Sequence, residues 1–210
     1  MSDPGAFAPR SPLEGAMPSS GLLTSSAALV SAAGVEAVVR DGLGLATILE
    51  RRRSTDGLPQ RVRERFGLEL PTGPRRSAAS GTAFVGTGPG AWLAIGERGG
   101  NEFAATLMRD LDGVASVADQ SDGYVLIRLS GDRVRDALAK LIPINVHPRA
   151  FAVGDAASTV AALIGVTLWR LADESNAPVF EVVLFRSLAR SFWHALAGAG
   201  AQYGVAARIS

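Results

Sequence analysis

The sequence predicts an α+β fold built from two interlocked βαββαβ-type halves, and three observations predict it. Short apolar runs with strand-like patterns alternate with segments of helical periodicity. The order of these elements in the first half returns in the second half with one extra strand, although no residue-level repeat accompanies it. Apolar residues make up 47% of the 210 residues and charged residues 20%, which is enough hydrophobic material for a packed core.

Residues 1–35 are predicted to form an extended arm, ahead of a single α+β domain at residues 36–210. The first 26 residues are rich in Ser, Pro, Gly and Ala and carry only isolated apolar side chains. Two interpretations remain open for the arm. It is either a tail without structure of its own, or a segment ordered along a partner, with Leu13, Leu22 and Leu23 as anchors.

The first half of the domain is expected to contain four strands and two helices. Residues 82–86 and 91–95 are apolar runs separated by Thr87, Gly88, Pro89 and Gly90, which predicts a hairpin. Apolar residues at helical spacing favour the helix at residues 101–111. The full set of predicted elements is a strand at 45–52, a helix at 60–66, strands at 82–86 and 91–95, a helix at 101–111 and a strand at 114–119.

The second half nearly repeats this order, with one extra strand between its two helices. A turn at residues 120–123 leads into a strand at 124–130, whose Val125, Ile127 and Leu129 share one face. A helix at 132–141 ends before Pro143. Strands are predicted at 158–163, 165–171 and 179–185, followed by a helix that begins at the N-cap Ser187 and ends near Ala199.

The sequence gives little support for a catalytic motif. The glycines between Gly86 and Gly90 resemble a phosphate-binding loop, but a strand-like run follows them instead of a helix, which favours a hairpin turn. His147 and His194 would need further ligands such as Asp155 or Asp173 to hold zinc, and nothing in their spacing favours this. No serine stands in a Gly-x-Ser-x-Gly frame. We therefore predict no catalytic, cofactor-binding or metal-binding residues on this chain.

Charge and composition restrict the class of partner and the compartment. The formal charge is +1 with basic and acidic residues interspersed, so nucleic acid is not an expected partner. Nearly all basic residues are arginines, with Lys140 the only lysine; this suits either recognition of anions or a coding bias, and we favour the bias. The absence of cysteine, of a signal-like N-terminus and of a long apolar run predicts a cytoplasmic protein without a membrane partner.

The segment from Phe185 to Trp193 combines aromatic residues with Arg186 and Arg190 at a strand-to-helix transition. One interpretation is an interface, because Arg and Trp are enriched at binding hot spots. The other is that Ser187 caps the helix, Phe192 or Trp193 fills the core, and both arginines are solvated.

This segment, together with residues 145–154 (NVHPRAFAVG), resembles the gamma subunit of heterotetrameric sarcosine oxidase. Ser11–Leu13, residues 119–131 and Thr159 extend the resemblance along the chain, which is loose between Gly34 and Gly113. The resemblance implies two ferredoxin-like halves, as in the folate-binding part of aminomethyltransferases. It also implies a non-catalytic subunit of a complex that demethylates sarcosine to glycine and passes the one-carbon unit to tetrahydrofolate.

The same resemblance implies partners and cofactors. The alpha, beta and delta subunits are the expected partners, and FAD, FMN, NAD, tetrahydrofolate and zinc are expected on those subunits rather than on this chain. Docking on alpha is expected through Leu13, Phe151, Arg186, Arg190 and Trp193. Two alternatives remain: a subunit of a related N-methyl amino acid dehydrogenase, for example one acting on N-methylglutamate, or a free-standing folate-binding protein.

Overall fold

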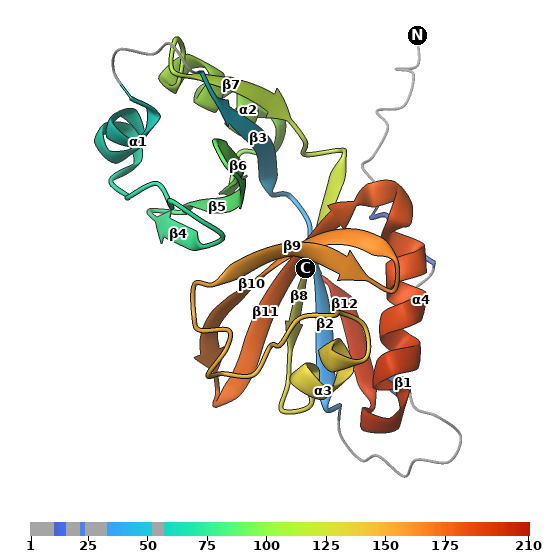
Figure 1. The fold of residues 1–210 in the computed structure, drawn as a ribbon. Helices are drawn as coiled ribbons and strands as arrows, with labels where there is room; N and C mark the ends of the chain where they lie inside the picture. Colours follow the sequence, from blue (N-terminus) through green and yellow to red (C-terminus); the bar gives the residue numbers. More distant parts are fainter. Residues whose placement is uncertain (1–10, 16–21, 24–32, 52–56) are drawn as a thin grey trace, which may run out of the picture.

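The computed structural model describes residues 11–15, 22–23, 33–51 and 57–210, and these residues form two β-sheets with helices on their outer faces (Figure 1). The smaller sheet has five strands in the order β4-β5-β6-β3-β7, all antiparallel to their neighbours. Its elements, in chain order, are β3 (Gly44–Glu50), α1 (Leu58–Phe66), β4 (Arg76–Ala79), β5 (Thr82–Gly88), β6 (Ala91–Gly96), α2 (Gly100–Asp110) and β7 (Ala115–Asp119).

The larger sheet has seven strands in the order β1-β12-β2-β8-β11-β10-β9. All neighbouring pairs are antiparallel except β12 and β2. Its elements are β1 (Leu22–Leu23), β2 (Val35–Arg40), β8 (Tyr124–Ser130), α3 (Val134–Ala139), β9 (Ala156–Ala161), β10 (Ile164–Glu174), β11 (Ala177–Phe185), a 3₁₀ turn (Arg186–Leu188), α4 (Ala189–Gly200), a second 3₁₀ turn (Ala201–Tyr203) and β12 (Val205–Ile209).

The two halves have the same topology, which confirms the predicted pair of α+β units. The smaller half runs β3-α1-β4-β5-β6-α2-β7 and the larger runs β8-α3-β9-β10-β11-α4-β12. In each sheet the first, last and two central hairpin strands stand in the ferredoxin-like order, with one additional strand at the edge, β4 or β9. Strand β2 is the extra element, and it lies between β12 and β8.

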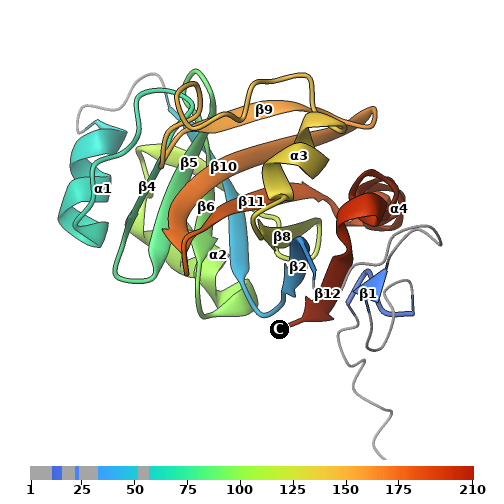
Figure 2. The same ribbon diagram turned by 90° about the horizontal axis from the view of Figure 1, so that it is seen from below.

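The core is divided into three layers by the two sheets. Helices α3 and α4 cover the outer face of the larger sheet, and Phe192 and Leu196 share one core cluster with Ile127 and Leu129. Helices α1 and α2 cover the outer face of the smaller sheet. The inner faces pack on each other through a third cluster that includes Leu45, Leu93, Trp169 and Val183 (Figure 2). Two sheets back to back with helices outside leave no free apolar face on most strands.

Backbone contacts also join the halves along β4 and β9. Arg75 forms an isolated bridge with Asp155, and its guanidinium makes an ion pair with the Asp155 carboxylate at 2.7 Å. The amide of Ala156 donates to the carbonyl of Pro74 at 2.8 Å. These contacts and the shared inner core hold the two halves together.

The predicted turn at residues 120–123 is present, and it connects β7 of the smaller sheet to β8 of the larger one. Other predicted details were wrong. Ser187 makes no capping hydrogen bond, since it lies inside the 3₁₀ turn that precedes α4. Strands β1, β2, β4 and β12 were not predicted. Among the described helices, none is both long and apolar enough to cross a membrane.

The described part of the arm lies on the domain itself. Leu13 is fully buried in the core of the larger half, and β1 pairs with β12. Strand β2 of the larger sheet begins at Val35, next to the predicted boundary. Residues 1–10, 16–21 and 24–32 of the arm lie outside the described part of the chain.

Candidate functional site

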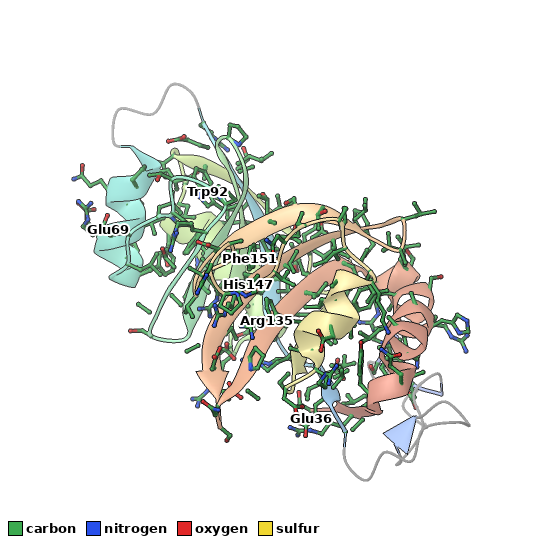
Figure 3. The ribbon with its side chains drawn as sticks, turned by 60° about the horizontal axis from the view of Figure 1, so that its bottom comes forward. Glu36, Glu69, Trp92, Arg135, His147 and Phe151 are labelled. Atoms are coloured by element: carbon green, nitrogen blue, oxygen red, sulfur yellow. The ribbon has the colours of Figure 1, made fainter. Side chains whose placement is uncertain are left out.

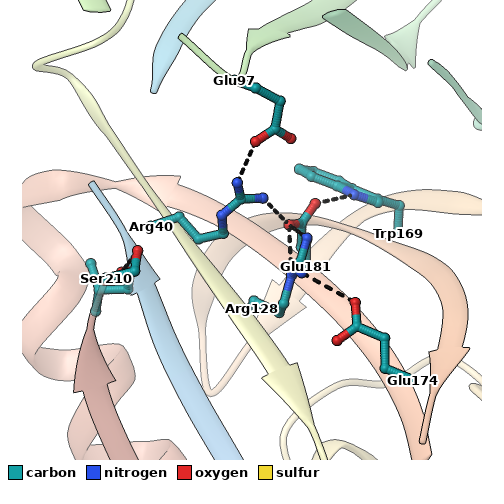
Figure 4. Close-up of polar contacts among 8 residues, drawn as sticks. Arg40, Glu97, Arg128, Trp169, Glu174, Glu181 and Ser210 are labelled. Carbon is teal, nitrogen blue, oxygen red and sulfur yellow. Dashed lines mark hydrogen bonds and ion pairs between the residues drawn. The ribbon is translucent and has the colours of Figure 1, made fainter. Parts of the chain in front are cut away.

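The most unusual side chain between the sheets is Glu181, a carboxylate with a relative exposure of 2%. Its Oε1 accepts hydrogen bonds from Arg40 Nη1 at 2.9 Å and from Arg128 Nε and Nη2 at 3.1 and 2.9 Å. Its Oε2 accepts one from Trp169 Nε1 at 2.9 Å. Both arginines reach further carboxylates, Arg40 to Glu97 and Arg128 to Glu174 (Figure 4). We name these six residues the Glu181 cluster.

The strand that carries Glu181 explains its burial. Along β11, Phe180, Val182 and Leu184 face the helices, whereas Glu181 and Val183 face the smaller sheet. Burying an ionised carboxylate is costly unless opposite charges and hydrogen bonds replace its hydration. Two guanidinium groups and an indole N–H do so here.

Arg40 ties the two sheets together. It is the last residue of β2 in the larger sheet, and Glu97 follows β6 in the smaller sheet. Burial acts to lower the pKa of Arg40, but the hydrogen bonds to Glu97 and Glu181 outweigh it and raise the pKa overall. Because both oxygens of Glu181 already accept donors, this carboxylate is suited to holding the halves in register and poorly suited to accepting a substrate proton.

A third arginine, Arg76, lies beside the cluster. Burial lowers the pKa of Arg76, against the opposing attraction of Glu181 and Glu97. The Nε of Arg76 is buried and has no hydrogen-bond partner. The inner polar region therefore holds three arginines around one buried carboxylate.

An open groove of about 540 Å³ lies between the sheets. The smaller sheet contributes Thr47, Trp92 and Leu93, and the larger sheet contributes Tyr124, Val160, Gly165 and Phe185. The rings of Tyr124 and Phe185 lie 5.0 Å apart and form one aromatic wall. Hydroxyl groups of Thr87, Ser158, Thr159 and Thr167 also line the groove. This is the size of a cavity that accepts a small ligand or the side chains of a partner segment.

The predicted docking residues do not form one surface. Leu13, Phe151 and Trp193 have exposures of 0%, 6% and 5% and belong to the core of the larger half, so their assignment to an exposed interface is corrected. Phe151 stacks on Phe180 with centroids 6.4 Å apart. Phe151 and His147 come from the same loop (Figure 3). Arg186 is half-buried and Arg190 is exposed, so of the five only these two reach the surface.

The glycine-rich segment and the two histidines, which the sequence did not favour as functional sites, lie in a hairpin, in a loop and on the surface of a helix. Residues Thr87–Gly90 form the β5–β6 hairpin, with a register shift between Gly86 and Gly88. His147 Nδ1 accepts the amide of Arg149 at 3.2 Å within its loop, and His194 is exposed on α4. Within the described residues there is no group of three or more His, Asp or Glu side chains placed to hold a metal ion.

Most of this chain matches a known protein family. Residues 54–202, well over half of the chain, match the profile of the "Sarcosine oxidase, gamma subunit family". The chain belongs to this family. A curated member, the sarcosine oxidase subunit gamma of Corynebacterium sp. (strain P-1), is 36% identical over 149 residues, which cover 70% of this chain and 66% of that protein. One third of that relative's length thus lies outside the match.

Solved structures share the fold of this chain over most of its length. A chain of the heterotetrameric sarcosine oxidase from Corynebacterium sp. U-96, solved in complex with pyrrole 2-carboxylate, superposes with a TM-score of 0.75 and 25% identity, covering 93% of this chain and 96% of that chain. The glycine cleavage system aminomethyltransferase T from Bartonella henselae superposes with a TM-score of 0.62 and 14% identity, covering 94% of this chain and 56% of that one. The second likeness concerns the fold alone.

Sequence reasoning missed both the Glu181 cluster and the groove. One signal for the cluster was available: Glu181 is a single acid within an otherwise apolar strand, Ala177–Phe185. A charged residue at such a position requires a buried partner. The groove left no signal of its own, because its walls come from strands of different sheets.

Proposed function

We propose that this gamma-family chain is a non-catalytic subunit of a heterotetrameric sarcosine oxidase that converts sarcosine to glycine and transfers the one-carbon unit to tetrahydrofolate. The observation that carries the proposal is the superposition on 96% of a chain from such an enzyme, joined to the family match. A gamma-family fold of this extent supports a role within an assembly rather than a separate enzyme.

We propose that this chain has a structural, stabilising role. The chain docks on the alpha subunit and stabilises its folate-binding region, so that the one-carbon unit is passed on and is not released as formaldehyde. The Glu181 cluster suits this role, because it fixes the relative position of two sheets and so presents a rigid outer surface. Beta and delta subunits complete the proposed cytoplasmic complex, and FAD, FMN, NAD, tetrahydrofolate and zinc are carried by the other subunits.

Deleting this chain tests the proposal. The remaining three subunits, co-expressed from the same genome with and without this chain, are compared for assembly, thermal stability and sarcosine turnover with tetrahydrofolate present. We expect the three-subunit preparation to be less stable and to release more formaldehyde per glycine formed. Unchanged assembly, stability and formaldehyde yield would refute the proposed role.

The groove between the sheets favours a second candidate, the binding of a folate-class ligand by this chain itself. Its volume of about 540 Å³ and its aromatic wall suit a flat heterocycle. Calorimetric titration of the isolated chain with tetrahydrofolate separates the two candidates: saturable heat favours folate binding, and its absence favours the subunit role. Replacing sarcosine by N-methylglutamate in the turnover assay tests whether the complex acts on a related N-methyl amino acid.

A further inference from the structure

The residue types in the β9–β10 turn are unusual for its backbone conformation. Three hairpins of the described chain have two-residue turns in which both residues adopt positive φ. Two of them, Ser80–Gly81 and Ser175–Asn176, contain residue types common in such turns. The third consists of Ala162 at φ 47° and Leu163 at φ 70°. A leucine in the left-handed region is disfavoured, because its Cβ approaches the neighbouring carbonyl oxygen.

Leu163 is also almost fully solvent-exposed, at 95%. The residue therefore carries two costs in the isolated chain, a strained backbone and a hydrated apolar side chain, and no intramolecular packing offsets them. Strained and exposed apolar residues of this kind concentrate at binding sites.

Other exposed apolar side chains lie at the same end of the larger sheet. Val160, Phe185 and Leu188 have exposures of 43%, 53% and 36%. Strand register places Val160 opposite Gly165, and Phe185 opposite Tyr124. The β9–β10 turn and the start of α4 lie near each other at this end in both ribbon views (Figures 1 and 2). We name Val160, Leu163, Phe185 and Leu188 the apolar strip.

The apolar strip is continuous with the groove between the sheets. Val160 and Phe185 belong to both, and Gly165 lies between their strands in the wall of the groove. A Cβ at Gly165 would meet no atom within 4 Å. The absence of a side chain at this position therefore leaves space in the groove that an incoming side chain can occupy.

The exposed side of α4, which begins next to the apolar strip, carries positive charge. Residues 189–200 of α4 contain Arg190 and no Asp or Glu, whereas Asp41 and Asp122 line a neighbouring pocket together with Arg186. Arg190 and His194 are exposed on the outer side of α4, which begins directly after Leu188. A partner that covers this end of the sheet therefore meets apolar side chains bordered by positive charge, and acidic groups complement it.

We propose that the apolar strip and the groove form the surface by which this chain docks on the alpha subunit, where they bind an apolar segment with flanking acidic residues. Leu163 inserts into that subunit, an apolar side chain of the segment enters the groove above Gly165, and a carboxylate meets Arg190. This inference rests on the proposed function and adds to it the surface and the chemistry of its partner.

The test uses the tagged full-length chain co-expressed with the other three subunits, and compares the amount of each subunit retained on the tag. Leu163→Asn removes the apolar anchor and relieves the backbone, because Asn tolerates positive φ. We expect retention to fall about tenfold, the effect of losing an interface anchor, while the thermal midpoint of the isolated variant stays equal or rises. Leu163→Met should keep both properties.

Matched controls separate docking from general surface effects. Met108, on α2, is an exposed apolar residue at 46% outside the apolar strip, so Met108→Asn should retain all subunits. Gly165→Leu fills the groove and should reduce retention. Arg190→Glu should reduce it more than Arg65→Glu on the exposed side of α1.

Each outcome decides between the two proposals. If the wild-type chain retains no subunit, the proposed function fails and the docking site fails with it. If the wild type retains them and Leu163→Asn does so equally, only the docking site is refuted. If sedimentation shows that Leu163→Asn converts a dimer of this chain into a monomer without loss of the other subunits, the occupant is a second copy and the proposed partner is wrong.

Discussion

The Nη1 of Arg40 donates a hydrogen bond to Glu181 Oε1 over 2.9 Å, and this contact joins the end of β2 to the middle of β11. The same guanidinium binds Glu97 beyond the end of β6, so one arginine is shared by both sheets. Side-chain exposures of 19% for Arg40 and 3% for Glu181 place the contact largely out of water. The ion pair therefore contributes more to the relative position of the sheets than an ion pair on the surface does.

Glu181→Gln removes the negative charge that compensates Arg40 and Arg128. We expect the free energy of unfolding to fall by about 3 kcal/mol, because breaking a buried ion pair leaves uncompensated charge. Urea denaturation of the two proteins measures this. The control is Glu69→Gln, which breaks the exposed pair with Arg63 and should leave stability unchanged. Equal effects of the two substitutions would contradict the role assigned to the Glu181 cluster.

Trp169→Phe tests the remaining hydrogen bond to Glu181. Trp169 is fully buried, and its Nε1 is the donor to Oε2. Loss of the donor should cost about 1–3 kcal/mol, since the carboxylate oxygen is left without a partner. In the double variant with Glu181→Gln, we expect the free energy of unfolding to fall by less than the sum of the two single losses, because both substitutions act on one hydrogen-bond network. Strict additivity in denaturation experiments would show that the indole acts only through packing.

Gly86→Ala tests the close approach of the loop before β4 to β5. A Cβ at Gly86 would lie 2.0 Å from the carbonyl oxygen of Gly73, which is backbone and has little freedom to move. We expect a loss of about 2–4 kcal/mol, at or above the upper range for inserted core atoms. Gly88→Ala, on the same strand with open space around its Cβ, is the matched control and should change stability little. If both substitutions lowered the free energy of unfolding by the same small amount, the loop before β4 would be able to move away from β5 with little loss of stability.

Much of the fold was predictable because local patterns fix element type. Val125, Ile127 and Leu129 were expected on one face of a strand, and all three lie in the core beneath α3 and α4. The repeated element order was also recognisable, and it corresponds to two sheets of the same topology. The family resemblance drawn from the residues was confirmed by the family match.

Other features were not predictable, because they depend on which strands become neighbours. The turn after Asp119 has the residues of a hairpin, yet the chain crosses there from one sheet to the other. Strand β12 is short and contains small residues, and it is held by parallel pairing with β2, some 170 residues earlier in sequence. Phe151 and Trp193 have the residue types of hot spots, but aromatic side chains serve cores equally well.

The central claim, that this gamma-family chain works as part of a larger oxidase, is tested most directly by the mass of the assembly that it enters. The four subunits are co-expressed with the tag on this chain, and the eluate is measured by sedimentation, subunit stoichiometry and flavin absorbance. The account predicts one stoichiometric complex that contains flavin and oxidises sarcosine. A colourless chain that elutes without the other subunits would contradict it.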